Sequence, residues 1–182
     1  MIDVLTLQGV TVTVTAGTIR NFEVLSVVDS TIPTIAAICG GSTTIGGTSM
    51  IGSVLGCVSD DTIVVTDDAV VTMAVEGAGG ADVISVTGNA SVAGLVRGGG
   101  DGQDGSAASD GADVITIDTT GSVGGVMGDA GDDRIALLSG SADSVSGGDG
   151  DDMVTLDGAS VAGAVTGDAG TDVLALLSGS AD

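Results

Sequence analysis

The sequence predicts an all-β fold: a parallel β-roll or β-helix solenoid with coils of about 20 residues and two short strands in each coil. Three observations lead to this prediction. Aspartates that precede an apolar alternation recur at nearly constant intervals, apolar residues after them occupy every second position, and glycine makes up 33 of 182 residues. Period-two alternation is typical of strands with one buried face, and so much glycine disfavours helix.

The repeat is visible from the aspartates that introduce each alternation. Successive members are 21, 31, 20, 19 and 20 residues apart: Asp61, Asp82, Asp113, Asp133, Asp152 and Asp172. The long step contains an insertion, "RGGGDGQDGSAAS" at 97–109. A fixed period of this length indicates units that are too small to bury their own apolar face and therefore stack on their neighbours.

Each unit shows the same internal order. The second and fourth residues after the aspartate are large and apolar, as in Ile84 and Val86, and the residue between them is mostly Ser, Thr or Ala. A polar turn follows, then a second apolar stretch such as "SVAGLV" (91–96), and then the next Gly-Asp turn. Two strands and two turns therefore form one flattened coil, and coils stacked at about 4.8 Å form two parallel sheets.

The composition excludes several classes of function. The formal net charge is −22, from 25 acidic residues against three arginines, with no histidine. Nucleic acids are poor partners for such a surface, because their binding depends on basic residues that neutralise phosphates. Without histidine there is no His-based triad and no H-E-x-x-H zinc site, so we expect no catalytic residues and no enzyme activity. No apolar run reaches the roughly 20 residues of a membrane helix.

The first 55 residues differ from the rest. "DVLTLQGVTVTVTAGT" (3–18) alternates Thr and Val like a two-faced strand or hairpin, and aspartates are few. We interpret 1–55 as an N-terminal β cap with coils that carry no ion ligands, and 56–182 as the solenoid whose turns carry them. "ALLSGSAD" at 136–143 returns at 175–182, so we expect the array to continue beyond residue 182. Cys39 and Cys57 lie nearly one coil apart and are either bridged or two buried thiols.

The turns before the aspartates carry the chemistry. "GGDGDDMVT" (147–155) fits the pattern G-G-x-G-x-D-x-U-x, where U is a large apolar residue. The turns "GAGGAD", "SDGAD", "GDAGDD" and "GDAGTD" lose the second glycine but keep the fourth-position glycine, the aspartate and the apolar residue. Over roughly 56–182 the chain resembles the RTX (repeats-in-toxin, haemolysin-type) calcium-binding family, which occurs in bacterial S-layer proteins and large adhesins. The resemblance implies Ca²⁺ held between successive turns and export of the unfolded chain through a type I channel.

Hard oxygen ligands suit Ca²⁺, and stacked carboxylates about 5 Å apart would repel one another without added cations. The expected Ca²⁺-binding residues are Gly80, Asp82, Asp110, Asp113, Asp129, Asp132, Asp133, Asp149, Asp151, Asp152, Asp168 and Asp172, with Asp101 and Asp104 in the insertion. Because the motif occurs once per coil, we expect one ion row, with partial or absent sites along the opposite edge (Asp118, Asp143, Asp157). The pairs Asp60/Asp61 and Asp67/Asp68 lack the glycine and are expected to bind no ion.

The position directly after each aspartate faces outward and is largely apolar: Val83, Val114, Met153 and Val173, with Arg134 as the exception. A solvated face would normally carry more charge, so we expect this one to pack against another chain or another part of its own. The sequence therefore predicts an extracellular structural protein at the bacterial surface that self-associates, as an S-layer subunit or matrix filament. The alternative is the repeat stalk of a large adhesin that presents a separate binding domain. A cell-surface glycan is a further partner that we expect of such a protein.

Overall fold

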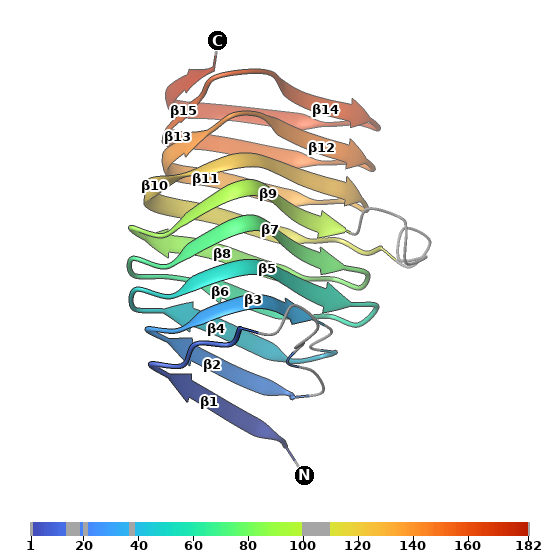
Figure 1. The fold of residues 1–182 in the computed structure, drawn as a ribbon. Helices are drawn as coiled ribbons and strands as arrows, with labels where there is room; N and C mark the ends of the chain where they lie inside the picture. The colour runs from blue at the N-terminus through green and yellow to red at the C-terminus, as the bar shows by residue number, and fades with distance from the viewer. Residues whose placement is uncertain (1, 14–18, 20–21, 37–38, 100–109, 182) are drawn as a thin grey trace.

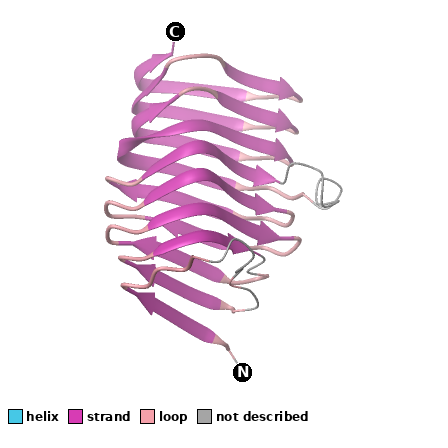
Figure 2. Ribbon diagram, in the orientation of Figure 1, coloured by secondary structure: helices cyan, strands magenta, loops and turns pink. Residues whose placement is uncertain are grey.

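The computed structural model describes residues 2–13, 19, 22–36, 39–99 and 110–181 and shows a parallel β-solenoid (Figure 1). Its fifteen strands pair along one continuous stack, and no helix is present in the described residues (Figure 2). The coils rise from the N-terminus at one end to the C-terminus at the other, as Figure 1 shows. The predicted fold class is confirmed.

The strands form two faces. The first sheet contains, in spatial order, β1 (Val4–Gln8), β2 (Val24–Val28), β4 (Ser42–Gly46), β6 (Thr62–Val65), β8 (Val83–Gly88), the first half of β10 (Val114–Ala130), β11 (Arg134–Ala142), β13 (Met153–Val161) and β15 (Val173–Ala181). The second sheet contains β3 (Thr31–Ala36), β5 (Met50–Cys57), β7 (Val70–Ala78), β9 (Ser91–Gly99), the second half of β10, β12 (Val145–Asp149) and β14 (Val165–Ala169).

Every strand pair in the stack is parallel, and the register follows the period of the sequence. Val114 pairs with Arg134, which pairs with Met153, which pairs with Val173. Across the insertion Val83 pairs directly with Val114, so the register of the stack is the same on both sides of it. Residues 100–109, with the predicted ligands Asp101 and Asp104, lie outside the described residues.

The alternation places aliphatic side chains in the interior. The second and fourth residues after each aspartate are at most 3% exposed in the coils from β6 to β13: Ile63, Val65, Ile84, Val86, Ile115, Ile117, Ile135, Leu137, Val154 and Leu156. Their counterparts on the second sheet, such as Val75 and Val96, are fully buried. The core is thus a thin layer of branched side chains between two sheets about 10 Å apart.

The parallel stacking extends into the first 55 residues. β1 pairs in parallel with β2, and β2 with β4, at the same coil length as the rest of the chain. Val4–Gln8 is therefore a solenoid strand, and its pairing within the described residues is parallel.

Cys39 and Cys57 form a disulfide with their Cα atoms 5.3 Å apart, which decides between the two alternatives that the sequence left open. Disulfides persist in oxidising compartments, so this bond points to an oxidising environment. Among the described residues, no helix has the length and apolar character needed to cross a membrane.

Candidate functional site: an aspartate ladder inside one corner

The aspartates that introduce the first-sheet strands point into the solenoid. We call Asp61, Asp82, Asp113, Asp133, Asp152 and Asp172 the aspartate ladder. The first five are between 1% and 3% exposed, whereas Asp172, in the last described coil, is exposed. Buried ionisable groups are costly unless they are paired, so a column of them requires a specific reason.

One oxygen of each ladder carboxylate bonds to the preceding coil. The Asp61 N–H donates to Asp82 Oδ1 (2.6 Å), the Asp82 N–H to Asp113 Oδ1 (2.7 Å), and the Asp113 N–H to Asp133 Oδ1 (2.7 Å). The same bond recurs from Asp133 to Asp152 (2.9 Å) and from Asp152 to Asp172 (3.1 Å). A short side chain at this corner thus satisfies a buried amide of the coil before it, which a buried backbone donor requires.

In four of the ladder aspartates the other oxygen has no partner. The Oδ2 atoms of Asp82, Asp113, Asp133 and Asp152 are buried and accept no hydrogen bond. They lie against a glycine whose missing side chain makes room for them. A Cβ on Gly77 would lie 2.2 Å from Asp82 Oδ2 and 2.4 Å from the Gly98 carbonyl oxygen.

The same crowding recurs one step along the stack. A Cβ on Gly128 would lie 2.1 Å from Asp133 Oδ2 and 2.3 Å from the Gly147 carbonyl oxygen, and Gly147 stands in the same relation to Asp152 and Gly167. Two acceptor oxygens therefore face the same small space in successive coils, and the Oδ2 atom accepts no hydrogen bond there. Such a space attracts a proton or a cation.

Burial raises the pKa of the ladder carboxyls. The pKa is raised from 3.8 to about 7 for Asp82, about 8 for Asp113 and about 7 for Asp133, with desolvation as the main cause and neighbouring carboxylates adding to it. The N–H bonds to Oδ1 act in the opposite direction and are outweighed. Burial also raises the pKa of Asp61 and Asp152. The ladder is therefore unfavourable in its fully ionised form unless positive charge compensates it.

A second group of predicted ligands lies on the outside of the same corner and caps turns. Asp132 Oδ1 accepts the Asp151 N–H (2.9 Å), and Asp151 Oδ1 accepts the Thr171 N–H (2.8 Å). Asp110 Oδ2 accepts the Ala130 N–H (3.0 Å), while its Oδ1 is buried without a partner. Burial raises the pKa of Asp110 to about 6. These carboxylates each bond to the coil that follows, in the opposite direction to the ladder.

The remaining predicted ligands are engaged in other ways. Asp129 forms a bidentate ion pair with Arg97, with 2.6 Å between Oδ1 and Nη2, so a cation already neutralises it. Asp168 accepts hydrogen bonds from the Ser146 and Thr166 hydroxyls. Asp149 is exposed, and Gly80 adopts a φ of +107° with its carbonyl oxygen accepting the Gly111 N–H at 2.9 Å.

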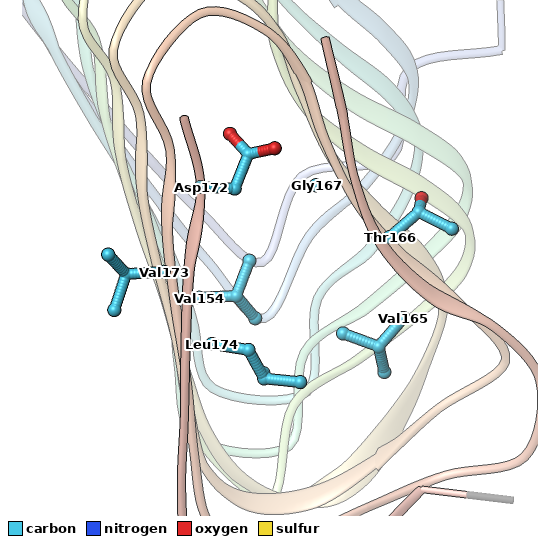
Figure 3. Close-up of a pocket in the computed structure, with 7 residues that line it drawn as sticks. All are labelled: Val154, Val165, Thr166, Gly167, Asp172, Val173 and Leu174. Atoms are coloured by element: carbon cyan, nitrogen blue, oxygen red, sulfur yellow. The ribbon is translucent and has the colours of Figure 1, made fainter. Parts of the chain in front are cut away.

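The last described coil shows the ladder position from the open end of the stack. Figure 3 shows Asp172 projecting between the two walls beside Gly167, with Val154 and Leu174 below it. These residues line a hollow together with Val165, Thr166 and Val173. Leu174 is 54% exposed here, whereas its counterpart Val154 is 3% exposed under a following coil.

Sequence reasoning set Asp61 apart because its turn lacks the glycine, yet the structure places it in the same column. Its Oδ1 accepts the Gly41 N–H (3.0 Å), and its Oδ2 accepts the Cys57 N–H (2.9 Å). The column also has an earlier member that sequence reasoning missed, because Glu23 accepts the Asp3 N–H at 2.7 Å from the equivalent position. The usable signal was an acid directly before the apolar alternation, whatever the preceding turn.

The donor set suits a hard cation in its chemistry, since carboxylate and carbonyl oxygens are the ligands that Ca²⁺ takes. In the described part of the chain, however, no three His, Cys, Asp or Glu side chains gather at one point in the manner of a metal cage. An ion in this corner would instead have to be held by the Oδ2 atoms of successive coils together with glycine carbonyls. On the opposite edge, Asp118 and Asp157 accept hydrogen bonds from Ser139 (2.8 Å) and Ser178 (2.5 Å) and are exposed.

Comparison with known proteins finds no match: no family model, no curated protein and no solved structure is similar to this chain.

Proposed function

We propose that this chain is a calcium-stabilised structural repeat segment of an extracellular bacterial protein, of the RTX-like kind that its turns resemble. The observation that carries the proposal is the column of buried Oδ2 atoms that accept no hydrogen bond, each lying against a glycine. Beside Asp82, Asp133 and Asp152 a glycine carbonyl oxygen of the next coil faces the same space. A cation at these positions would neutralise the ladder and join neighbouring coils, so its binding would be coupled to folding.

Calcium is the cation that we propose, because the oxygens are hard and the nearest arginine at this corner, Arg97, is paired with Asp129. Extracellular modules typically bind Ca²⁺ with a Kd of about 10⁻⁴–10⁻³ M, which matches a site that fills on export. The disulfide supports the same location, since it needs an oxidising compartment.

Circular dichroism and thermal melting in EGTA and in millimolar Ca²⁺ test the calcium role. The Ca²⁺ form should melt well above the EGTA form, and isothermal titration should show several ions per chain. Asp133→Ala should remove about one ion, whereas Asp118→Ala, on the opposite edge, should remove none. Identical melting in the two buffers contradicts the calcium role.

The proposed role is architectural and non-enzymatic, since the chain has no histidine and the ladder aspartates serve contacts between coils. Assembly into an S-layer or matrix filament is our first proposal. A repeat stalk of a large adhesin is the second, favoured by the linear array in which each coil contacts only its neighbours. Negative-stain electron microscopy with Ca²⁺ distinguishes them: an assembly subunit forms sheets or fibres, and a stalk remains a single rod.

A further inference from the structure

The outer face of the first sheet is unusually poor in charge. In each of its nine described strands the first and third residues after the ladder position face outward, and of these eighteen residues only Arg134 is charged. The others are Val, Met, Ser, Thr or Ala: Val4, Thr6, Val24, Ser26, Ser42, Thr44, Thr62, Val64, Val83, Ser85, Val114, Thr116, Ala136, Met153, Thr155, Val173 and Ala175. In a chain of net charge −22, the first and third positions of these strands thus carry no acidic residue, and the acids Asp118 and Asp157 lie further along the strands, at the edge of the face.

The face is also regular. Over the first four residues of each strand, none of the described strand pairs of this sheet has a register shift. Shifts begin only after Ile117 and after Leu156. The second sheet has shifts between Ile51 and Ser53 and between Val123 and Gly125. Two charged residues that pair between β7 and β9, Glu76 and Arg97, also lie on its outer side. The first sheet is therefore the better surface for packing sheet against sheet.

Val4, Val83, Val114 and Val173 are between 38% and 61% exposed on the first-sheet face. Nine strands about 4.8 Å apart and five residues long cover roughly 40 Å by 16 Å. Pairing two such faces would bury about 1,300 Å² in total, which lies within the range of stable protein interfaces.

The charges at the rim select one orientation of the pair. Asp118 and Asp157 lie at the far end of the same strands, four residues beyond the position of Arg134, on the outward side of the alternation. Among the described residues, no carboxylate lies within ion-pairing distance of Arg134. If a second copy is turned about an axis parallel to the solenoid axis, its strands run antiparallel to those of the first.

In that orientation the Arg134 position of one copy faces the end of β11 in the other, at Leu138 and Ser139. Asp118 of β10 pairs with Ser139, and Asp157 of β13 directly follows Leu156, the partner of Leu137. The two acids therefore lie in the strands on either side of β11, each about 4.8 Å away. Each arginine can then reach an acid of the other copy. The edges of the two solenoids that carry the Gly-Asp turns, which we call the Gly-Asp edges, lie on opposite sides of the pair. The reverse orientation would bring the two Gly-Asp edges together and repel.

We propose that two copies of this chain pair through the first-sheet faces with antiparallel strands, and that Arg134 of each copy bonds to Asp118 or Asp157 of the other. This deepens the proposed self-association and rests on it, by naming the face, the partner and the orientation. It does not depend on calcium beyond the requirement that the solenoid be folded.

Sedimentation equilibrium of the folded chain at low salt, between about 1 and 200 μM, measures the pairing. Val83→Glu places an acid within the first-sheet face, and Met73→Glu makes the same change at a 64% exposed site on the second sheet. Val83→Glu and Arg134→Glu should each weaken dimerisation at least tenfold, and Met73→Glu should leave it unchanged. The triple variant Arg134→Glu, Asp118→Arg, Asp157→Arg should restore the dimer to within about threefold of the parent chain.

Circular dichroism of every variant confirms that the solenoid is intact. A folded parent chain that stays monomeric at 200 μM overturns this proposal and the proposed self-association, and leaves the calcium role untouched. A dimer that Met73→Glu weakens as much as Val83→Glu, or that the charge swap does not restore, overturns the proposed face or its orientation and leaves self-association standing.

Discussion

Raising the pH in the absence of calcium should destabilise this solenoid, because the ladder carboxyls must ionise inside it. The pKa of Asp82 is about 7 in the folded chain and 3.8 without its surroundings. Between these values the folded state holds a proton that the unfolded state has released. The free energy of unfolding therefore falls as the pH rises through this window, by about 1.4 kcal/mol per pH unit for each such group.

The size of the effect follows from the structure. Asp113 and Asp133 have similarly raised pKa values, about 8 and about 7, for the same reason of burial. The shift of Asp82 spans about three pH units and is worth roughly 4 kcal/mol at most. A domain is typically stable by only 5–15 kcal/mol, so ionising two or three of these groups is enough to unfold the calcium-free chain.

Urea unfolding at pH 5, 6, 7 and 8 in EGTA, followed by circular dichroism, measures the slope. Asp113→Asn is the matched variant, because the amide oxygen still accepts the Asp82 N–H while the side chain cannot ionise. It should flatten the slope by about one group and be more stable than the parent at pH 8. A stability that is constant or rises from pH 5 to pH 7 would refute the reasoning, and Ca²⁺ should restore the stability lost at pH 8.

Three further perturbations test separate parts of the structure. Gly128→Ala should lower the free energy of unfolding in urea by about 1–3 kcal/mol, because its Cβ would meet the Asp133 carboxylate and the Gly147 carbonyl oxygen. Gly9→Ala is the control: a Cβ there meets nothing within 4 Å, so it should cost only the backbone strain of about 1 kcal/mol. Reduction of the disulfide, or Cys39→Ser with Cys57→Ser, should lower the free energy of unfolding by about 3 kcal/mol, and an unchanged melting temperature would show that the bond does not constrain the coils. Asp152→Ala removes the acceptor of the buried Asp133 N–H and should lower the free energy of unfolding by about 1–3 kcal/mol. Asp118 is exposed, so Asp118→Ala should change the free energy of unfolding by no more than about 0.5 kcal/mol. Equal losses would contradict the different roles of the two edges.

The sequence by itself determined the coil. Apolar residues at every second position after each aspartate, as in Ile135 and Leu137, specify one buried face, and their return after about 20 residues specifies which residues lie above one another. A slip of one residue in the strand pairing would turn every such side chain to solvent, so the sequence alone predicts the register. The exposed outer face, with Val83 and Val114, follows from the same alternation.

Only the tertiary structure decided what the aspartates do. Asp133 and Asp132 are adjacent in the chain, yet the first is buried and bonds to the coil before it, and the second is exposed and bonds to the coil after it. Each partner is an amide 19 or 20 residues away that becomes a neighbour only when the coils stack. The inclusion of Asp61, the pairing of Cys39 with Cys57 and the unpartnered Oδ2 atoms depend on the same stacking, because depth and hydrogen-bond partners belong to the space between coils rather than to any one turn.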